Sequence, residues 1–212
     1  MGASASELVR RFYKQFAGED QVLILINADP DAIASAMAIK RLLWRKVLGV
    51  TITCINQVDR PDNLAMIRLL GVKLVYIEDL KISRFNRFAI VDSQPAHHEL
   101  LSQVDPHVII DHHPETGAQA PFQDIRPHYG AVASIMTEYL RAAKIKPSAR
   151  LATGLYLAIK TDTHDFEQQA IAEDVQAFQY LFKYINRHLA RKIEQSELKL
   201  EYLKYFKTVS YT

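Results

Sequence analysis

Short, uninterrupted apolar runs alternate with helix-like segments along the first half of the chain. The runs have the pattern of strands covered on both faces of a sheet: Gln21–Asn27, Val50–Ile55, Leu74–Ile77, Phe88–Val91 and Val108–Ile110. Apolar residues at helical spacing predict helices over Ser4–Ala17, Asp31–Val47, Pro61–Leu70 and Ala96–Leu101. This alternation predicts an α/β fold, with a mostly parallel, doubly wound sheet and helices on both faces.

From Ala131 onward the pattern is helical throughout. Helices are predicted over Ala131–Ala143, Ser148–Lys160, Ala170–Tyr184 and His188–Phe206, which gives the α/β sheet a helical C-terminal region. The last of these carries two apolar stripes, whereas a lone surface helix needs only one. We therefore expect one domain over 1–185, and over 186–212 a linker or a docking helix. Its residues 188–206 would face a second subunit or a further domain.

Composition narrows the class of protein. Hydrophobic residues make up 49% and charged residues 24% of the 212, which excludes a disordered or collagen-like chain. The net charge of +2 does not by itself call for nucleic acid. Residues 183–207 hold seven Lys/Arg against three Glu. That excess is either a solvated helix face or a surface that meets nucleic acid or another domain.

Three features of the sequence indicate the cellular compartment of the protein. The single cysteine, Cys54, cannot form an internal disulfide, and its apolar neighbours predict a buried thiol. The first residues lack the apolar core of a signal peptide, and no apolar run reaches the roughly 18 residues of a membrane span. We expect a cytoplasmic protein with no membrane partner.

Carboxylates and imidazoles follow the predicted strands. Asp29 and Asp31 come after the first strand, Asp92 after the fourth, and the triplet 111–113 (Asp-His-His) after the fifth, while Asp162 ends an apolar helix. Ligands of open α/β sheets bind beyond the carboxyl ends of the strands, so these side chains are expected to converge. Singly, each Asp could be a helix cap or a turn residue, above all Asp31, which opens a helix.

Converging carboxylates repel one another and resist burial unless a cation neutralises them. Carboxylates with imidazole and without thiolate suit Mn²⁺, with Mg²⁺, Fe or Co²⁺ as substitutes. The group as a whole therefore predicts a divalent metal site.

Four motifs occur in order: Asn27–Ser35 (NADPDAIAS), Val91–Ser93 (VDS), Asp111–Pro114 (DHHP) and Lys160–Thr163 (KTDT). With Gly130–Ser134 at the start of a helix, they resemble the DHH phosphoesterases. This superfamily holds RecJ-type nucleases, nanoRNases, cyclic dinucleotide phosphodiesterases and manganese-dependent pyrophosphatases. The resemblance covers about residues 21–181.

The resemblance implies a set of metal ligands. Asp92 matches the carboxylate that bridges two ions, and Asp31, His112 and Asp162 match the remaining ligands of one ion. Asp29 matches a ligand of the other. The family usually has a histidine four residues before Asp29, where this chain has Leu25. One tight metal site and one weak site are therefore expected.

The resemblance also implies roles next to the metals. His113 matches the histidine that faces substrate phosphate, so His113 and Asp92 are the predicted catalytic residues, and Asp111 is expected to orient an imidazole. Arg126 and His128 are candidate phosphate contacts, although a turn role fits them equally well.

Two histidine positions outside the motifs stay open. His164 is expected at the surface, with a compensating ligand role as the alternative. His97 and His98 are expected in solvent, with one able to approach the site.

The function that these features imply is metal-dependent hydrolysis of a phosphodiester or phosphoanhydride bond. The substrate would be a short oligonucleotide, a cyclic dinucleotide or a phosphorylated nucleotide. The alternative is a degenerate DHH domain that binds nucleotide or metal and regulates a partner. The family's second, substrate-binding domain has no counterpart in these residues, so the chain is either a single-domain variant or a piece of a longer protein.

Overall fold

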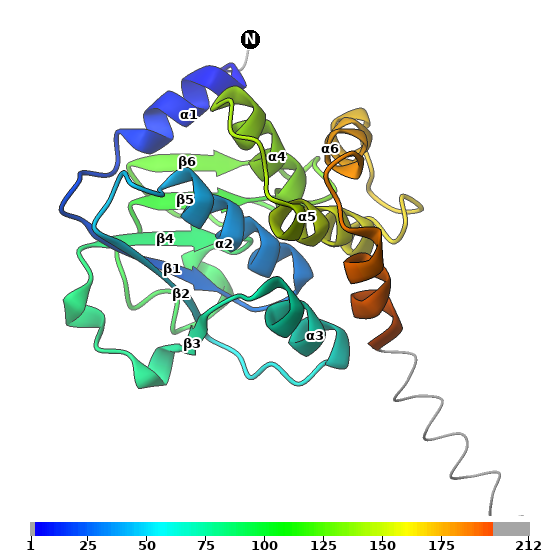
Figure 1. The fold of residues 1–212 in the computed structure, drawn as a ribbon. Coiled ribbons are helices and arrows are strands. Elements are labelled where there is room, and N and C mark those ends of the chain that lie inside the picture. The colour runs from blue at the N-terminus through cyan, green and yellow to red at the C-terminus, as the bar shows by residue number, and fades with distance from the viewer. Residues whose placement is uncertain (1–2, 197–212) are drawn as a thin grey trace, which may run out of the picture.

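Six parallel strands form one sheet in the computed structural model, which describes residues 3–196. The strand order is β3-β2-β1-β4-β5-β6, so β1 lies in the middle and the order reverses between β1 and β4 (Figure 1). The register pairs Gln21 with Gly49 on one side of β1 and Val22 with Arg87 on the other. This confirms the predicted α/β class.

The element bounds follow the apolar runs closely. The strands are β1 (Gln21–Ile26), β2 (Gly49–Cys54), β3 (Leu74–Tyr76), β4 (Arg87–Val91), β5 (Val108–Asp111) and β6 (Phe122–Ile125). The α-helices are α1 (Ala5–Tyr13), α2 (Pro30–Leu42), α3 (Pro61–Leu70), α4 (Val132–Ala142), α5 (Ala149–Asp162) and α6 (Ala172–Phe182). Three short 3₁₀ helices are η1 (Ile77–Asp79), η2 (Ile82–Arg84) and η3 (Pro95–His97).

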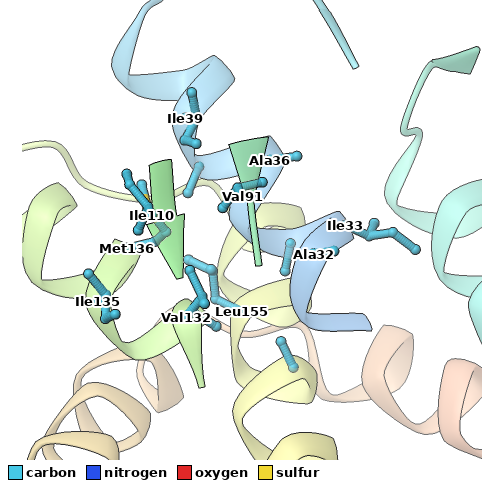
Figure 2. Packing of buried hydrophobic residues seen from close by; sticks show 14 of the residues in the cluster. Ala32, Ile33, Ala36, Ile39, Val91, Ile110, Val132, Ile135, Met136 and Leu155 are labelled. Atoms are coloured by element: carbon cyan, nitrogen blue, oxygen red, sulfur yellow. The ribbon is translucent and has the colours of Figure 1, made fainter. Parts of the chain in front are cut away.

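One face of the sheet carries the main core (Figures 1 and 2). Helix α2 lies between the strands and α5, and it is buried almost all round because Ala32, Ala36 and Ile39 expose no surface. Gly154 allows the close approach of α5, since a Cβ there would lie 2.9 Å from Leu70 Cδ1 and 3.6 Å from Ala34 Cβ. This packing brings the N-terminus of α2 and the C-terminus of α5 to the same edge of the sheet.

The opposite face is covered without an α-helix in the described part of the chain. Leu23, Leu25 and Ile90 pack there against Leu101 and against residues near η1 and η2. Because β1→β2 and β4→β5 run outward in opposite directions, right-handed crossovers place their connections on opposite faces. We expected helices on both faces of the sheet. The structure has α-helices on one face and short 3₁₀ helices on the other.

The prediction of a helix over Ala96–Leu101 is wrong. Only η3 forms there, and local side-chain contacts replace the hydrogen bonds of an α-helix. Nδ1 of His97 accepts from the Gln94 N–H at 3.2 Å, and Nδ1 of His98 accepts from the Leu100 N–H at 3.1 Å. The segment therefore stays a loop beside the end of β4.

After β5 the structure differs from the sequence prediction in one strand and extends it in one helix. Strand β6 escaped the sequence analysis because its four residues (FQDI) are half polar and lie at the edge of the sheet. Residues 187–196 are helical, while the rest of the helix predicted over His188–Phe206 lies outside the described residues. No helix within residues 3–196 has the length and apolar character needed to cross a membrane.

The loop cover of the second face should contribute to stability. Leu101 is fully buried in this face, whereas its neighbour Leu100 is only partly buried. We expect Leu101→Ala to lower the free energy of unfolding by about 2–5 kcal/mol, because a cavity opens under the sheet. Urea unfolding measures this, with Leu100→Ala as the matched control. Equal losses in the two variants would contradict the described packing.

Candidate metal centre

Residues from four separate segments meet at the carboxyl edge of the sheet. Asp31 stands in the first turn of α2, just after β1, and Asp92 follows β4 directly. His112 follows β5, and Asp162 is the last residue of α5. The point where they meet lies beside the reversal of strand order between β1 and β4, where open α/β sheets bind their ligands.

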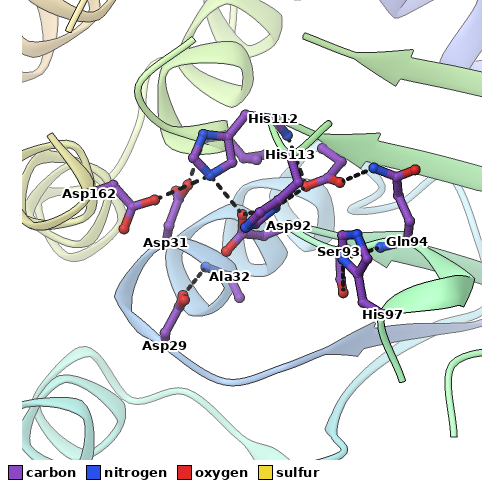
Figure 3. Close-up of polar contacts among 12 residues, drawn as sticks. Asp29, Asp31, Ala32, Asp92, Ser93, Gln94, His97, His112, His113 and Asp162 are labelled. Atoms are coloured by element: carbon purple, nitrogen blue, oxygen red, sulfur yellow. Dashed lines mark hydrogen bonds and ion pairs between the residues drawn. The ribbon is translucent and has the colours of Figure 1, made fainter. Parts of the chain in front are cut away.

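The four side chains are close enough to share one cation (Figure 3). One ligand atom each from Asp31, Asp92, His112 and Asp162 lies within 4.8 Å of every other. Nε2 of His112 is 3.4 Å from Asp92 Oδ1 and 3.4 Å from Asp162 Oδ2. Metal–oxygen bonds of roughly 2.0–2.6 Å place opposing ligands about 4–5 Å apart, so these spacings suit a single ion.

The N-terminus of α4 holds Asp31 in place. Its two carboxylate oxygens accept hydrogen bonds from the backbone N–H groups of Val132 (2.6 Å) and Ala133 (2.7 Å). Just before this turn, Gly130 lets the chain pack closely on the segment that follows α5, because a Cβ there would lie 2.8 Å from the Gln169 carbonyl oxygen. The motif 130–134 therefore acts through its backbone as an anchor for a carboxylate about a hundred residues away.

A backbone carbonyl sets the orientation of His112. The Tyr129 carbonyl oxygen lies 3.1 Å from Nδ1 of His112 and can only accept, so the hydrogen is on Nδ1. The lone pair of Nε2 then faces the carboxylates, as in histidine ligands whose other nitrogen is hydrogen-bonded.

Asp92 occupies a special position. Its backbone is in the left-handed region (φ 59°), which Asp tolerates better than most residues. The side chain is buried, and Oδ1 has no hydrogen-bond partner among residues 3–196. A buried carboxylate oxygen without a donor is costly unless a cation meets it. This orphaned oxygen, together with the donor set, fits a divalent metal.

The electrostatics of the cluster favour protonation while no cation is present. Burial is the largest cause, and the neighbouring carboxylates add to it: together they raise the pKa of Asp162 to about 10 and that of Asp92 well above its usual range. Burial also raises the pKa of Asp31 to about 6, despite the opposing His112. For His112, burial lowers the pKa, but the attraction of Asp31, the hydrogen bond to the Tyr129 carbonyl and the charge of Asp162 together outweigh it, and the net shift of the pKa is upward.

Asp111 and His113 form a separate pair beside the cluster. Nδ1 of His113 donates to Asp111 Oδ1 at 2.8 Å, and Gln94 Nε2 donates to Asp111 Oδ2 at 2.7 Å. Burial by itself would raise the pKa of Asp111, but these hydrogen bonds outweigh it and lower the pKa. The ring of His113 lies with Nδ1 4.0 Å from Asp92 Oδ1, and its side chain is 47% exposed.

Other predicted site residues have contacts of their own. Asp29 caps α2 by accepting from the Ala32 N–H at 2.9 Å, and its charge still raises the pKa of Asp92. Arg126 donates to Asp124 and Glu138, each at 2.8 Å, so a phosphate contact would have to compete with two ion pairs. His128 is exposed and packs against the Tyr129 ring. The phosphate roles of Arg126 and His128 remain predictions.

The groups that hold the cluster in place carry little signal in the sequence. Gln94 links the loops after β4 and β5, since it bonds Asp111, the Pro114 carbonyl and the Thr116 N–H. The Tyr129 carbonyl was missed too, because backbone groups carry no residue-type signal. A polar Gln two residues after a predicted ligand is the one hint that the sequence offers.

Comparison with known proteins shows the family of this chain and the fold that it shares. The model of the DHH family, N-terminal domain, matches residues 21–159. An uncharacterized protein of Methanocaldococcus jannaschii is 38% identical over 180 residues, which are 85% of this chain and 38% of that protein. An exopolyphosphatase-related protein of Bacteroides fragilis shares the fold, with TM-score 0.71 and 18% identity over 93% of this chain and 62% of that one.

Stability of the metal-free protein should fall as the pH rises. In the unfolded chain these carboxyl groups have pKa values near 4. In the folded protein the pKa is about 6 for Asp31 and about 10 for Asp162. Between these values the folded state binds more protons than the unfolded state, so stability decreases as the pH rises, by up to about 1.4 kcal/mol per pH unit for each proton.

Thermal unfolding in EDTA at pH 5, 7 and 9 measures this decrease. Asp92→Asn, which keeps a side chain tolerant of positive φ, should unfold at higher temperature than the wild type at pH 9 and show a weaker pH dependence. Substituting the exposed Asp79 by Asn serves as the control. A metal-free wild type that becomes more stable between pH 5 and 9 would contradict the described burial.

Proposed function

Because the chain belongs to the DHH family, we propose that it is a manganese-dependent phosphoesterase that hydrolyses phosphodiester or phosphoanhydride bonds. The observation that carries this proposal is the cluster of Asp31, Asp92, His112 and Asp162, with its buried and unpartnered Asp92 oxygen. Three carboxylates and one imidazole are a donor set that suits Mn²⁺, with Mg²⁺ or Co²⁺ as substitutes.

In this proposal the residues have different roles, which follow from their positions. Asp31, Asp92, His112 and Asp162 would hold the ion, which when bound supplies a hydroxide nucleophile at neutral pH and neutralises charge on the phosphate. Nδ1 of His113 donates to Asp111, so Nε2 carries a hydrogen only in the imidazolium form; in that form it would hydrogen-bond or protonate a phosphoryl oxygen. Asp111 thereby orients His113 and touches no substrate.

We further propose a small nucleotide-type substrate, such as a short oligonucleotide, a cyclic dinucleotide or a phosphorylated nucleotide. Support comes from the motifs, which bind phosphate and metal and make no demand on the base. The chain spans 38% of the length of the curated relative it matches. Substrate selection by a further domain, and its docking on residues 186–212, are therefore part of the same proposal.

The alternative function is a degenerate domain that binds nucleotide or metal without turnover. It is favoured by Leu25, which stands where the family usually has a histidine. Leu25 is fully buried among apolar residues on the second face of the sheet. The ion that Asp29 and Asp92 would share therefore has one ligand fewer than usual.

Hydrolysis of bis-p-nitrophenyl phosphate distinguishes the two functions. We expect turnover that requires Mn²⁺ and that falls at least 100-fold in Asp92→Ala and in His112→Ala, because each loses a ligand of the complete site. Asp79→Ala serves as the surface control. Nucleotide binding without turnover in the wild type would favour the regulatory module instead.

Metal titration tests the ligand assignment itself. The wild type should bind one Mn²⁺ tightly and a second weakly, and Leu25→His should strengthen the second site and raise activity. Because an imidazole then replaces a buried leucine side chain, we also expect a stability loss of about 1–3 kcal/mol. Leu23→His, two residues earlier on the same face, is the control that should lose stability without gaining metal. Two equally tight sites in the wild type would show that the assignment is wrong.

A further inference from the structure

His97 lies against the catalytic histidine that the motifs identify. Its ring centroid is 5.3 Å from that of His113, with the two planes at 77° (Figure 3). Ligand atoms of His97, Asp111 and His113 lie within 4.8 Å of one another, and His113 belongs also to a second such group with Asp92 and His112. His97 therefore extends the metal cluster outward, from a loop on the second face of the sheet.

The hydrogen bonds of His97 determine which of its nitrogens is free. The backbone N–H of Gln94 donates to Nδ1 at 3.2 Å, and the Ser93 hydroxyl lies 3.2 Å from the same atom. A backbone N–H can only donate, so Nδ1 accepts and the hydrogen of the neutral ring is on Nε2. Nε2 is then a donor, which suits an oxyanion and cannot coordinate a metal ion.

Buried hydrogen bonds hold the loop that carries His97 in place. Gln94 is fully buried, and its side chain ties the loop of His97 to Asp111 and to the backbone around Pro114 and Thr116. The Asp111 carboxylate already accepts hydrogen bonds from His113, Gln94 and the His112 N–H. Its negative charge is thus largely satisfied by donors and does not capture the free N–H of His97.

We propose that His97 and His113 together form a phosphate subsite beside the metal cluster, in which Nε2–H of His97 donates to a non-bridging phosphate oxygen. This inference rests on the proposed function, since it places the phosphoryl group of the same substrate class. His97 is a binding residue of this subsite and takes no part in holding the ion. Because the Asp111 carboxylate lies close by, an anion is repelled until the cation is bound, and phosphate binding requires Mn²⁺.

The test is calorimetric titration of the full chain with inorganic phosphate, with and without Mn²⁺. We expect phosphate to bind the manganese-loaded wild type and His97→Ala to weaken that binding at least tenfold, because a hydrogen bond to a charged group is lost. His97→Gln, whose amide N–H can reach a similar point, should recover part of the affinity. His98→Ala is the matched control, because His98 is the exposed neighbour whose Nδ1 bonds the Leu100 N–H.

Mn²⁺ affinity, measured without phosphate, separates this proposal from the proposed function. It should be unchanged in His97→Ala; a loss would make His97 a metal ligand and overturn the assignment of its donor. Phosphate binding equal in His97→Ala and the wild type would overturn the subsite, while manganese-dependent hydrolysis could still stand. No phosphate binding by the loaded wild type would also overturn the subsite, and the bis-p-nitrophenyl phosphate assay would then decide the function by itself.

Discussion

Two buried carboxylates and a half-buried third, all within a few ångströms of one another, are the constraint around which this molecule is arranged. Asp31 and Asp92 expose almost no surface, and Asp162 joins them from the end of α5. Such a group is stable only when donors, protons or a cation balance its charge. The structure supplies donors to Asp31 but leaves an Asp92 oxygen without one. That imbalance is what a metal ion would remove.

The scaffold that maintains this arrangement is distributed over the whole chain. Asp31 is fixed by the first turn of α4, His112 by a carbonyl in the loop before α4, and Asp162 by the packing of α5 on α2. Each side chain of the cluster thus depends on an element distant in sequence, and Gly154 permits the close packing of α5. A change in helix packing would therefore displace a side chain of the cluster.

The histidines illustrate how hydrogen bonds assign different tasks to one residue type. His112 has Nδ1 bound to a carbonyl and turns a lone pair toward the carboxylates. His113 has Nδ1 bound to Asp111, and His97 has Nδ1 occupied by a backbone N–H. The three rings lie close together, yet in their neutral forms these partners leave a lone pair on Nε2 of His112 and of His113 and a hydrogen on Nε2 of His97.

Five of the strands, their parallel direction and the acidic and histidine residues that follow them were determined by the sequence, because short β-branched runs form strands and parallel strands bring their carboxyl ends to one edge. The four motifs likewise indicated the DHH family. Tertiary structure alone decided the rest. The predicted helix at 96–101 became a loop, because side-chain and backbone hydrogen bonds of Gln94 and His97 outcompete a short helix. The anchors of Asp31 and His112 are backbone groups, which look the same in every residue and acquire a role only when the fold brings them to a ligand.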